Sequence, residues 1–235
     1  MHNSSKSSAA HAGALGGAAS TRLLLASLLA VALVACNGDG SNGSGQGDGA
    51  LSFGLAAADL NGDTLIDLVS ATVDNQDAAN AAAARVILRD VKAGDGFAAA
   101  MDYAMGAQAR HIAVGDLNGD GRADLLVSNY ADNALSLRLQ SSAAPGRFLS
   151  RTVIDQVFRP QEAVIADFNG DNLNDIAVIG SSIALLFNDA AEPGNFALGR
   201  LLSLAQPGRT IASADLDRDG RMDLVVGGGG NVITV

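Results

Sequence analysis

Residues 59–67 read Asp-Leu-Asn-Gly-Asp-Thr-Leu-Ile-Asp, and three more versions of this pattern follow at 116–124, 167–175 and 215–223. Each version places oxygen-bearing side chains at positions 1, 3, 5 and 9 of the nine. Carboxylates crowded into so short a stretch repel one another, and a bound cation removes that conflict. Oxygen-only ligands on a flexible loop suit Ca²⁺ better than Mg²⁺, which demands stricter octahedral geometry. We therefore expect up to four Ca²⁺ ions, one for each loop.

The expected ligands are the side chains at those four positions, with the backbone carbonyl of position 7 completing the set. In chain order they are Asp59, Asn61, Asp63, Asp67, Asp116, Asn118, Asp120, Asp124, Asp167, Asn169, Asp171, Asp175, Asp215, Asp217, Asp219 and Asp223. The fourth loop carries four carboxylates, whereas each of the others carries three and an asparagine. Because its repulsion is the largest, we expect the fourth site to depend most on its ion.

An EF-hand and a metal-free turn are the two alternatives to these calcium sites. An EF-hand also begins Asp-x-Asn-x-Asp, but it needs a Glu at position 12 and a helix on each side. Position 12 is Ser or Val in all four copies, and the flanking residues favour strands, so the EF-hand is excluded. A metal-free Asp/Asn/Gly turn is the other reading, and four copies in register disfavour it. Position 6 is Gly or Asn in three copies and Thr64 in the first, where a sharp turn is hardest to form.

The spacing of the pattern predicts a repeated all-β fold. The four copies begin 57, 51 and 48 residues apart, and Phe97, Phe148 and Phe196 each lie 19 residues before the Asp that opens the next copy. Short apolar runs bounded by Gly, Asn and Asp surround each loop and indicate strands. Four strands in a repeat of about 50 residues make one blade of a β-propeller. Residues 74–84, which are rich in alanine, indicate an insertion between the second and third strands of the first repeat, and a binding site is the alternative.

The Gly-x-Phe marker, the small-residue strand and the Asp-x-Asn-Gly-Asp-x-x-x-Asp loop together resemble the FG-GAP repeat, also called the VCBS-type repeat, over residues 51–235. The resemblance implies a seven-bladed propeller whose calcium loops join the first and second strands of each blade. Partners of such propellers often bind the opposite face. The chain shows four repeats, and the last ends after its third strand at Val235. We therefore expect a partial propeller with open, association-prone edges, and a closed four-bladed ring is the alternative.

The N-terminal residues predict export and a lipid anchor. Residues 1–35 read as a signal peptide whose apolar run, 23–35, is too short to cross a bilayer. The run ends in Leu33-Val34-Ala35-Cys36, which resembles a bacterial lipobox with Cys36 as the acylated residue; ordinary cleavage after Ala35 is the alternative. Residues 36–50 form a Gly/Ser-rich tether, and 51–235 form the repeat domain. In the lipoproteins that this sequence resembles, a residue such as Asn37 after the cysteine favours the outer over the inner membrane.

The composition excludes several functions. The chain has a net charge of −10 and no basic cluster, so nucleic acid is not an expected partner. The four loops hold 13 of the 25 acidic residues, so the acidity reflects metal ligation. His111 stands alone outside the signal and no nucleophile motif occurs, which predicts a non-enzymatic protein. We expect a module for adhesion, scaffolding or protein–protein contact with a protein or glycan ligand; the alternative is a substrate-positioning accessory domain of a larger secreted enzyme.

Overall fold

A computed structural model describes residues 50–74, 81–94, 96–204, 208–228 and 233–234. The expected signal peptide, Cys36, nearly all of the tether and Val235 lie outside these residues. The described residues fold into strands, turns and loops, with no α-helix among them. None of them therefore forms a helix of the length and hydropathy that crossing a bilayer requires.

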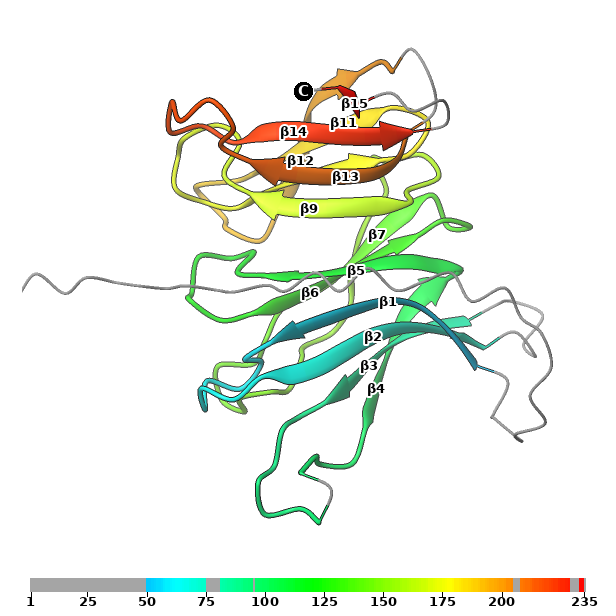
Figure 1. Cartoon of the computed structure of the whole chain (residues 1–235), viewed down its shortest axis with the longest axis vertical. Helices are drawn as coiled ribbons and strands as arrows, with labels where there is room; N and C mark the ends of the chain where they lie inside the picture. The colour runs from blue at the N-terminus through cyan, green and yellow to red at the C-terminus, as the bar shows by residue number, and fades with distance from the viewer. Residues whose placement is uncertain (1–49, 75–80, 95, 205–207, 229–232, 235) are drawn as a thin grey trace, which may run out of the picture.

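Within the described residues, fifteen strands form four antiparallel sheets, each made of consecutive strands in chain order (Figure 1). The first sheet contains β1 (Ala50–Ala58), β2 (Asp67–Asp74), β3 (Ala81–Ile87) and β4 (Met101–Ala107). The second contains β5 (Ala109–Gly115), β6 (Asp124–Asn129), β7 (Ala134–Arg138) and β8 (Thr152–Ile154). The third contains β9 (Glu162–Ala166), β10 (Asp175–Ile179), β11 (Ile183–Asn188) and β12 (Phe196–Leu202). The fourth contains β13 (Gly208–Ala214), β14 (Asp223–Gly228) and β15 (Ile233–Thr234).

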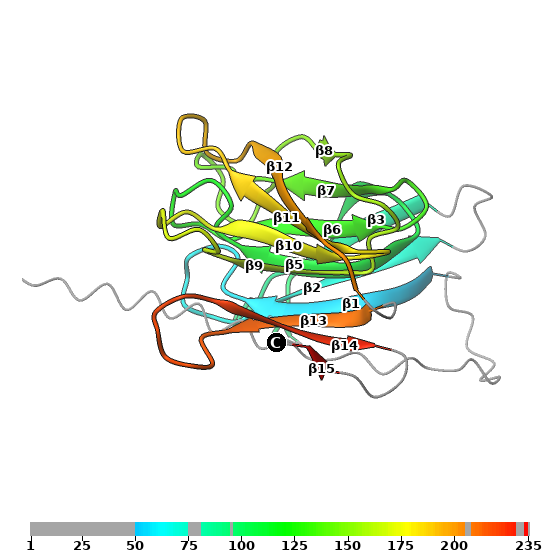
Figure 2. The same cartoon turned by 90° about the horizontal axis from the view of Figure 1, so that it is seen from above.

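These sheets are four blades, which confirms the predicted all-β, blade-repeat architecture. The first strands of the blades lie in a row, with β5 between β1 and β9 and with β13 beyond β9 (Figure 1); Figure 2 looks along this row. The row requires small residues where inner strands approach closely. A Cβ atom added to Gly115 would lie 3.0 Å from the Cγ2 atom of Ile165 on the neighbouring blade. The described residues form an open row of blades, so they do not show the closed four-bladed ring that was the alternative.

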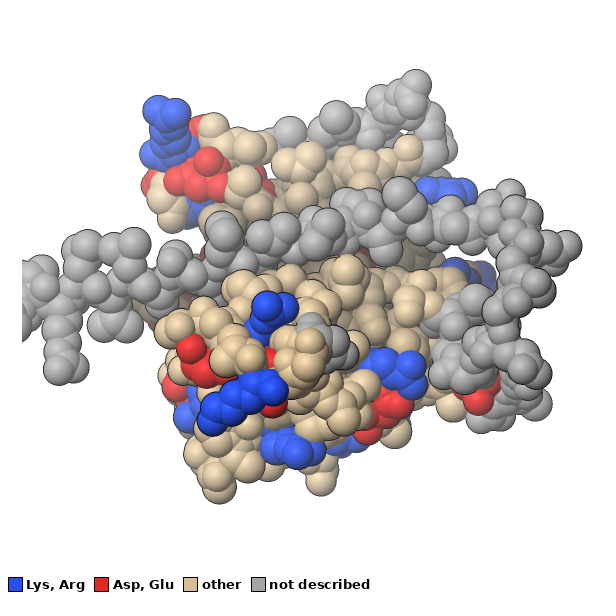
Figure 3. All heavy atoms as spheres, turned by 60° about the horizontal axis from the view of Figure 1, so that its bottom comes forward, with Lys and Arg blue, Asp and Glu red and all other residues tan. Residues whose placement is uncertain are grey.

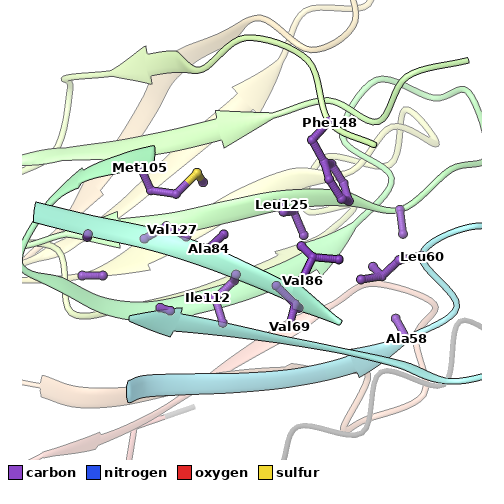
Figure 4. Close-up of a cluster of buried hydrophobic side chains, with 14 of the residues drawn as sticks. Ala58, Leu60, Val69, Ala84, Val86, Met105, Ile112, Leu125, Val127 and Phe148 are labelled. Atoms are coloured by element: carbon purple, nitrogen blue, oxygen red, sulfur yellow. The ribbon is translucent and has the colours of Figure 1, made fainter. Parts of the chain in front are cut away.

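The hydrophobic cores lie between blades rather than within them. Strand β6 is buried on both faces: Leu125 and Val127 enter a cluster shared with the first blade, and Leu126 enters one shared with the third. Figure 4 shows the first of these clusters, in which Leu60 from the first blade lies near Phe148 from the second. The continuous apolar runs of the sequence therefore mark central strands covered on both sides.

Two details of the predicted strands are wrong. The Phe marker opens the fourth strand only at Phe196, whereas Phe97 and Phe148 sit in isolated bridges before β4 and β8. The alanine-rich stretch is not a loop throughout, because Ala81–Ala84 belong to β3 and Ala82–Ala84 pair with β2. Ala82 and Ala84 are buried in the first inter-blade cluster, where small side chains allow the sheets to approach. Only residues 75–80 of that stretch lie outside the described residues.

A matched pair of leucines at position 2 of the first and fourth loops tests whether burial between blades holds the fold together. Leu60 has an exposed fraction of 0%, whereas Leu216 is 51% exposed. We expect Leu60→Ala to lower the free energy of unfolding by about 3 kcal/mol, because it leaves a cavity in the core. Leu216→Ala should change it by less than about 0.5 kcal/mol. Urea unfolding of the two variants measures this difference, and equal losses would contradict the inter-blade core.

Candidate metal centre

Each nine-residue pattern forms the loop between the first and second strands of its blade, and the Asp at position 1 organises it. In the β5–β6 loop, Asp116 Oδ1 accepts hydrogen bonds from the N–H groups of Asn118 (3.2 Å), Gly119 (2.7 Å) and Asp120 (3.1 Å). Its Oδ2 atom accepts one from the N–H of Gly121 at 2.7 Å. The corresponding carboxylates also accept two or more N–H groups of their own loops: Asp59, Asp167 and Asp215. The backbone thus curls around a carboxylate, as in an Asx turn.

Side chains at positions 3 and 5 face each other across the loop. Asn61 Nδ2 donates to Asp63 Oδ2 at 3.0 Å, and Asn118 and Asn169 make the same bond in their loops. Two arginines bring positive charge to the position-5 carboxylates of their loops. Arg122 contacts Asp120 Oδ2, and Arg221 lies 2.7 Å from Asp219 Oδ2. Amide and guanidinium groups therefore donate to carboxylate oxygens, whose negative charge favours a positive partner. A set of oxygen ligands with this excess negative charge fits a hard cation such as Ca²⁺.

The Asp at position 9 is buried and joins the loop to a distant strand end. Asp67, Asp124 and Asp175 each have an exposed fraction of 0%. One oxygen of each accepts the N–H of position 2 of the loop, at 2.8 Å from Leu60 in the first blade. The other accepts the N–H of a residue at or just after the end of the third strand, as Asp67 does from Arg89 at 2.6 Å. The sequence predicted these residues as ligands only, and their role in holding the blade together was missed.

Burial raises the pKa of these carboxyls, because it removes the water that stabilises the charged form. The effect is largest at Asp124, whose pKa rises from 3.8 to about 7. The hydrogen bonds from Gln140 and Leu117 oppose this rise, while the negative charges of Asp120 and Asp116 add to it. The pKa values of Asp67 and Asp175 are raised for the same reason. A bound cation would act in the opposite direction and favour the ionised carboxylates.

The fourth loop brings three of its predicted ligands together. Carboxylate oxygens of Asp215, Asp217 and Asp223 all lie within 4.8 Å of one another, the one such group of three His, Cys, Asp or Glu side chains among the described residues. Asp219 instead pairs with Arg221, whose backbone N–H lowers its pKa first and whose side chain lowers it further. Figure 3 shows this acidic group with basic side chains beside it at the end of the molecule where the β13–β14 loop lies.

The loops also require left-handed backbone at two positions. Position 6 has a φ of 70° at Thr64, 79° at Gly121, 68° at Asn172 and 86° at Gly220. Thr64 therefore adopts the left-handed backbone that the sharp turn requires. Its loop keeps the hydrogen bonds of the other loops, so the difficulty of forming the turn there is limited to backbone strain at Thr64. Position 4 is left-handed as well, and the fourth loop places Arg218 there with a φ of 65° where the others have glycine. This second strained position was not predicted from the sequence.

Comparison with known proteins agrees with this geometry. A family model described as an FG-GAP-like repeat matches residues 59–127, 116–178 and 167–226. The chain belongs to the FG-GAP-like repeat family. The repeats of this family generally build β-propeller-like interaction modules rather than catalytic domains, and they often bind calcium. Each match runs from one loop into the second strand of the next blade, so the FG-GAP-like unit spans parts of two neighbouring blades. No curated protein matches the chain.

His111, the histidine singled out by the sequence, lies between inner strands. Its Nε2 atom is 3.6 Å from Glu162 Oε1, and the N–H of Ala163 donates to its Nδ1 atom at 3.4 Å. Burial lowers its pKa, and the negative charge of Glu162 opposes that shift. The second oxygen of Glu162 accepts the N–H of Ile211 at 3.0 Å. This group links three inner strands, which agrees with a packing role for His111.

The residues that donate to the buried Asp from the third strand were not predicted from the sequence. They are Arg89, Gln140 and Asn188. Each lies eight residues before the Phe marker of its repeat, a fixed spacing that could have revealed them. Their side chains differ, however, so no residue-type pattern pointed to a shared task.

The raised pKa of Asp124 predicts a pH dependence for the calcium-free protein. Between about pH 4 and 7 the folded state keeps a proton on Asp124 that the unfolded chain has released. The free energy of unfolding should therefore fall as the pH rises through this range. We expect a higher melting temperature at pH 5.5 than at pH 7.5 in chelator, and a weaker dependence in Asp124→Asn. Saturating Ca²⁺ should reverse the trend, because the ion needs ionised carboxylates; the same trend with and without Ca²⁺ would contradict this.

Proposed function

We propose that this FG-GAP-like chain is a calcium-stabilised interaction module that binds up to four Ca²⁺ ions, one for each loop. The observation that carries the proposal is the repetition of one loop geometry in four blades. In each, backbone N–H groups bind a position-1 carboxylate, and the position-3 side-chain oxygen accepts the N–H of position 5. Bound ions would neutralise the loop carboxylates and cross-link the ends of the first two strands. Because an ion that binds the folded state alone stabilises it by mass action, the module would be most stable where calcium is plentiful.

The molecular role we propose is adhesion or scaffolding through a protein or glycan ligand. Support comes from the end of the blades opposite the loops. There the guanidinium carbons of Arg110 and Arg159 lie 5.0 and 5.5 Å from the centre of the Tyr130 ring, and Phe158 beside them is 61% exposed. Within the described residues neither arginine has a carboxylate partner. Exposed aromatic and arginine side chains are the types that most often anchor protein partners.

Calcium stoichiometry tests the main proposal. Equilibrium dialysis of chelator-treated protein in millimolar Ca²⁺ should recover up to four bound ions, and Ca²⁺ should raise the melting temperature. Asp171→Ala removes the position-5 carboxylate of the β9–β10 loop and should lower the stoichiometry by one. Asp189→Ala removes an exposed carboxylate outside the loops, which accepts the N–H of Ala191 at 2.8 Å, and should leave the stoichiometry unchanged. Wild-type protein that binds no calcium would overturn the proposal.

We also propose that the module is held at the bacterial cell envelope by a lipid on Cys36, on the outer rather than the inner membrane. The support is in the sequence alone, because these residues lie outside the described part of the chain. The sequence Leu33-Val34-Ala35-Cys36 precedes the Gly/Ser-rich tether at 36–50, which would separate the blades from the bilayer. More than one acyl chain on the cysteine would make the attachment stable.

The anchor has a direct test in a bacterial host. Cys36→Ala should abolish acylation and move the protein from the membrane fraction to the soluble fraction. Mass spectrometry of the N-terminal peptide should find lipid on wild-type Cys36. Ser44→Ala, in the tether, serves as the control that should remain in the membrane fraction. A wild-type peptide that carries no lipid would favour ordinary signal cleavage.

A further inference from the structure

Gln140 reaches from the second blade to the metal loop of the first. It follows β7, is 4% exposed, and its Nε2 atom donates to the carbonyl of Leu60 at 2.6 Å and to that of Ala123 at 3.1 Å. Leu60 is position 2 of the β1–β2 loop, and Ala123 is position 8 of the β5–β6 loop. A single buried amide therefore holds the loops of two neighbouring blades.

Asn188 makes the same connection one blade further along. Its Nδ2 atom donates to the carbonyl of Leu117 at 2.9 Å and to that of Asn174 at 2.8 Å. Leu117 and Asn174 are again position 2 of the preceding loop and position 8 of the loop in the same blade. The repetition at two blade junctions shows that the contact belongs to the architecture of the repeat.

These amides connect the buried carboxylates into one series. The N–H of Leu60 donates to Asp67 at 2.8 Å, and the carbonyl of Leu60 accepts from the side chain of Gln140. The N–H of Gln140 in turn donates to Asp124 at 2.7 Å. The hydrogen-bonded series runs through Asp67, Leu60, Gln140, Asp124, Leu117, Asn188 and Asp175. Through this series, a movement of one loop therefore displaces the peptide group at position 2 of the neighbouring loop.

The turn after each amide also lies against the preceding loop. A Cβ atom on Gly146 would be 3.2 Å from the Cβ of Asn61, and one on Gly194 would be 3.4 Å from the Cβ of Asn118. Asn61 and Asn118 are the position-3 residues of their loops. Each turn thus restricts a predicted ligand of the blade before it. Both glycines have a positive φ, 72° and 100°, so the turn itself excludes other residues.

We propose that Gln140 and Asn188 are positioning residues for the calcium sites of the preceding blades, and that they couple ion binding at neighbouring loops. This inference rests on the proposed calcium function. Groups that orient metal ligands from outside the ligand set commonly change affinity by about 10- to 100-fold when removed. Because coupling is reciprocal, each ion bound in one loop favours binding in the loop beside it. The first blade differs, because Arg89 occupies the equivalent position and its guanidinium carbon lies 4.9 Å from the centre of the Phe97 ring.

Loop glycines report each site separately. Full-length protein labelled with ¹⁵N-glycine is titrated with Ca²⁺, and the amide signals of Gly62, Gly119 and Gly170 follow the first three loops. Gln140→Met, which keeps the side-chain volume but removes the donor, should raise the calcium midpoint at Gly62 by about tenfold. The midpoint at Gly170, two loops away, should shift much less than the midpoint at Gly62. Asn188→Leu should act in the same way on Gly119.

Asn129 provides the matched control at the other end of the same junction. Its Nδ2 atom donates to the carbonyl of Met105 in the first blade at 2.8 Å, and it is fully buried, but it lies at the end of β6 opposite the metal loop. Asn129→Leu should lower the melting temperature and leave the Gly62 midpoint unchanged. An unchanged Gly62 midpoint in Gln140→Met would overturn the positioning role, as would an equal shift in Asn129→Leu.

Coupling is measured by a double-mutant cycle. Asp120→Ala disables the second loop and should raise the Gly62 midpoint in the wild-type background but not beside Gln140→Met; additive effects would refute coupling. If no glycine signal responds to Ca²⁺ in the wild type, the proposed calcium function fails instead. Hydrogen exchange at the Leu60 amide in chelator then decides positioning alone. Faster exchange in Gln140→Met than in Asn129→Leu supports it, and equal rates contradict it.

Discussion

The buried carboxylate at position 9 is the interaction on which the rest of the structure depends. Asp67, Asp124 and Asp175 are removed from water, and each satisfies both oxygens with backbone N–H groups from two separate segments. An unpaired buried carboxylate would be costly, so the loop and the third strand have to stay where they are. The same contact that closes the loop therefore fixes the register of the blade.

Packing between blades extends this constraint along the chain. Because central strands such as β6 and β10 are buried on both faces, no blade completes its own core. Stability in such arrays is approximately a sum of unit and nearest-neighbour terms. The Phe markers take part in this arrangement, since Phe148 lies in the cluster shared with the preceding blade. Hydrophobic packing and hydrogen bonds thus connect the same pairs of neighbouring blades.

The electrostatics of the loops follow from this compactness. Backbone N–H groups, amide nitrogens and two arginines compensate the loop carboxylates in part, while burial raises the pKa of the position-9 acids. A fold held by buried acids and strained left-handed residues such as Thr64 and Arg218 gains most from a ligand that neutralises charge. This is the physical reason why a cation would stabilise a β-propeller-like fold of this kind.

The sequence by itself determined the repeat, the all-β class and the place of each loop, because four loops recur every 48 to 57 residues, three Phe markers each precede a loop by 19 residues, and strand runs show in residue type. It also determined that positions 1, 3 and 5 lie on one loop, where hydrogen bonds join residues a few positions apart. Only the tertiary structure decided what Gln140 and Asn188 do, because their partners lie as far as 80 residues away, and what the position-9 acids do, because theirs lie up to 22 residues away. It likewise decided that Ala81–Ala84 form a strand, because alanine has weak intrinsic strand preference and is placed there by packing against the second blade. Local spacing encodes a loop, whereas a contact between blades exists only once both blades have formed.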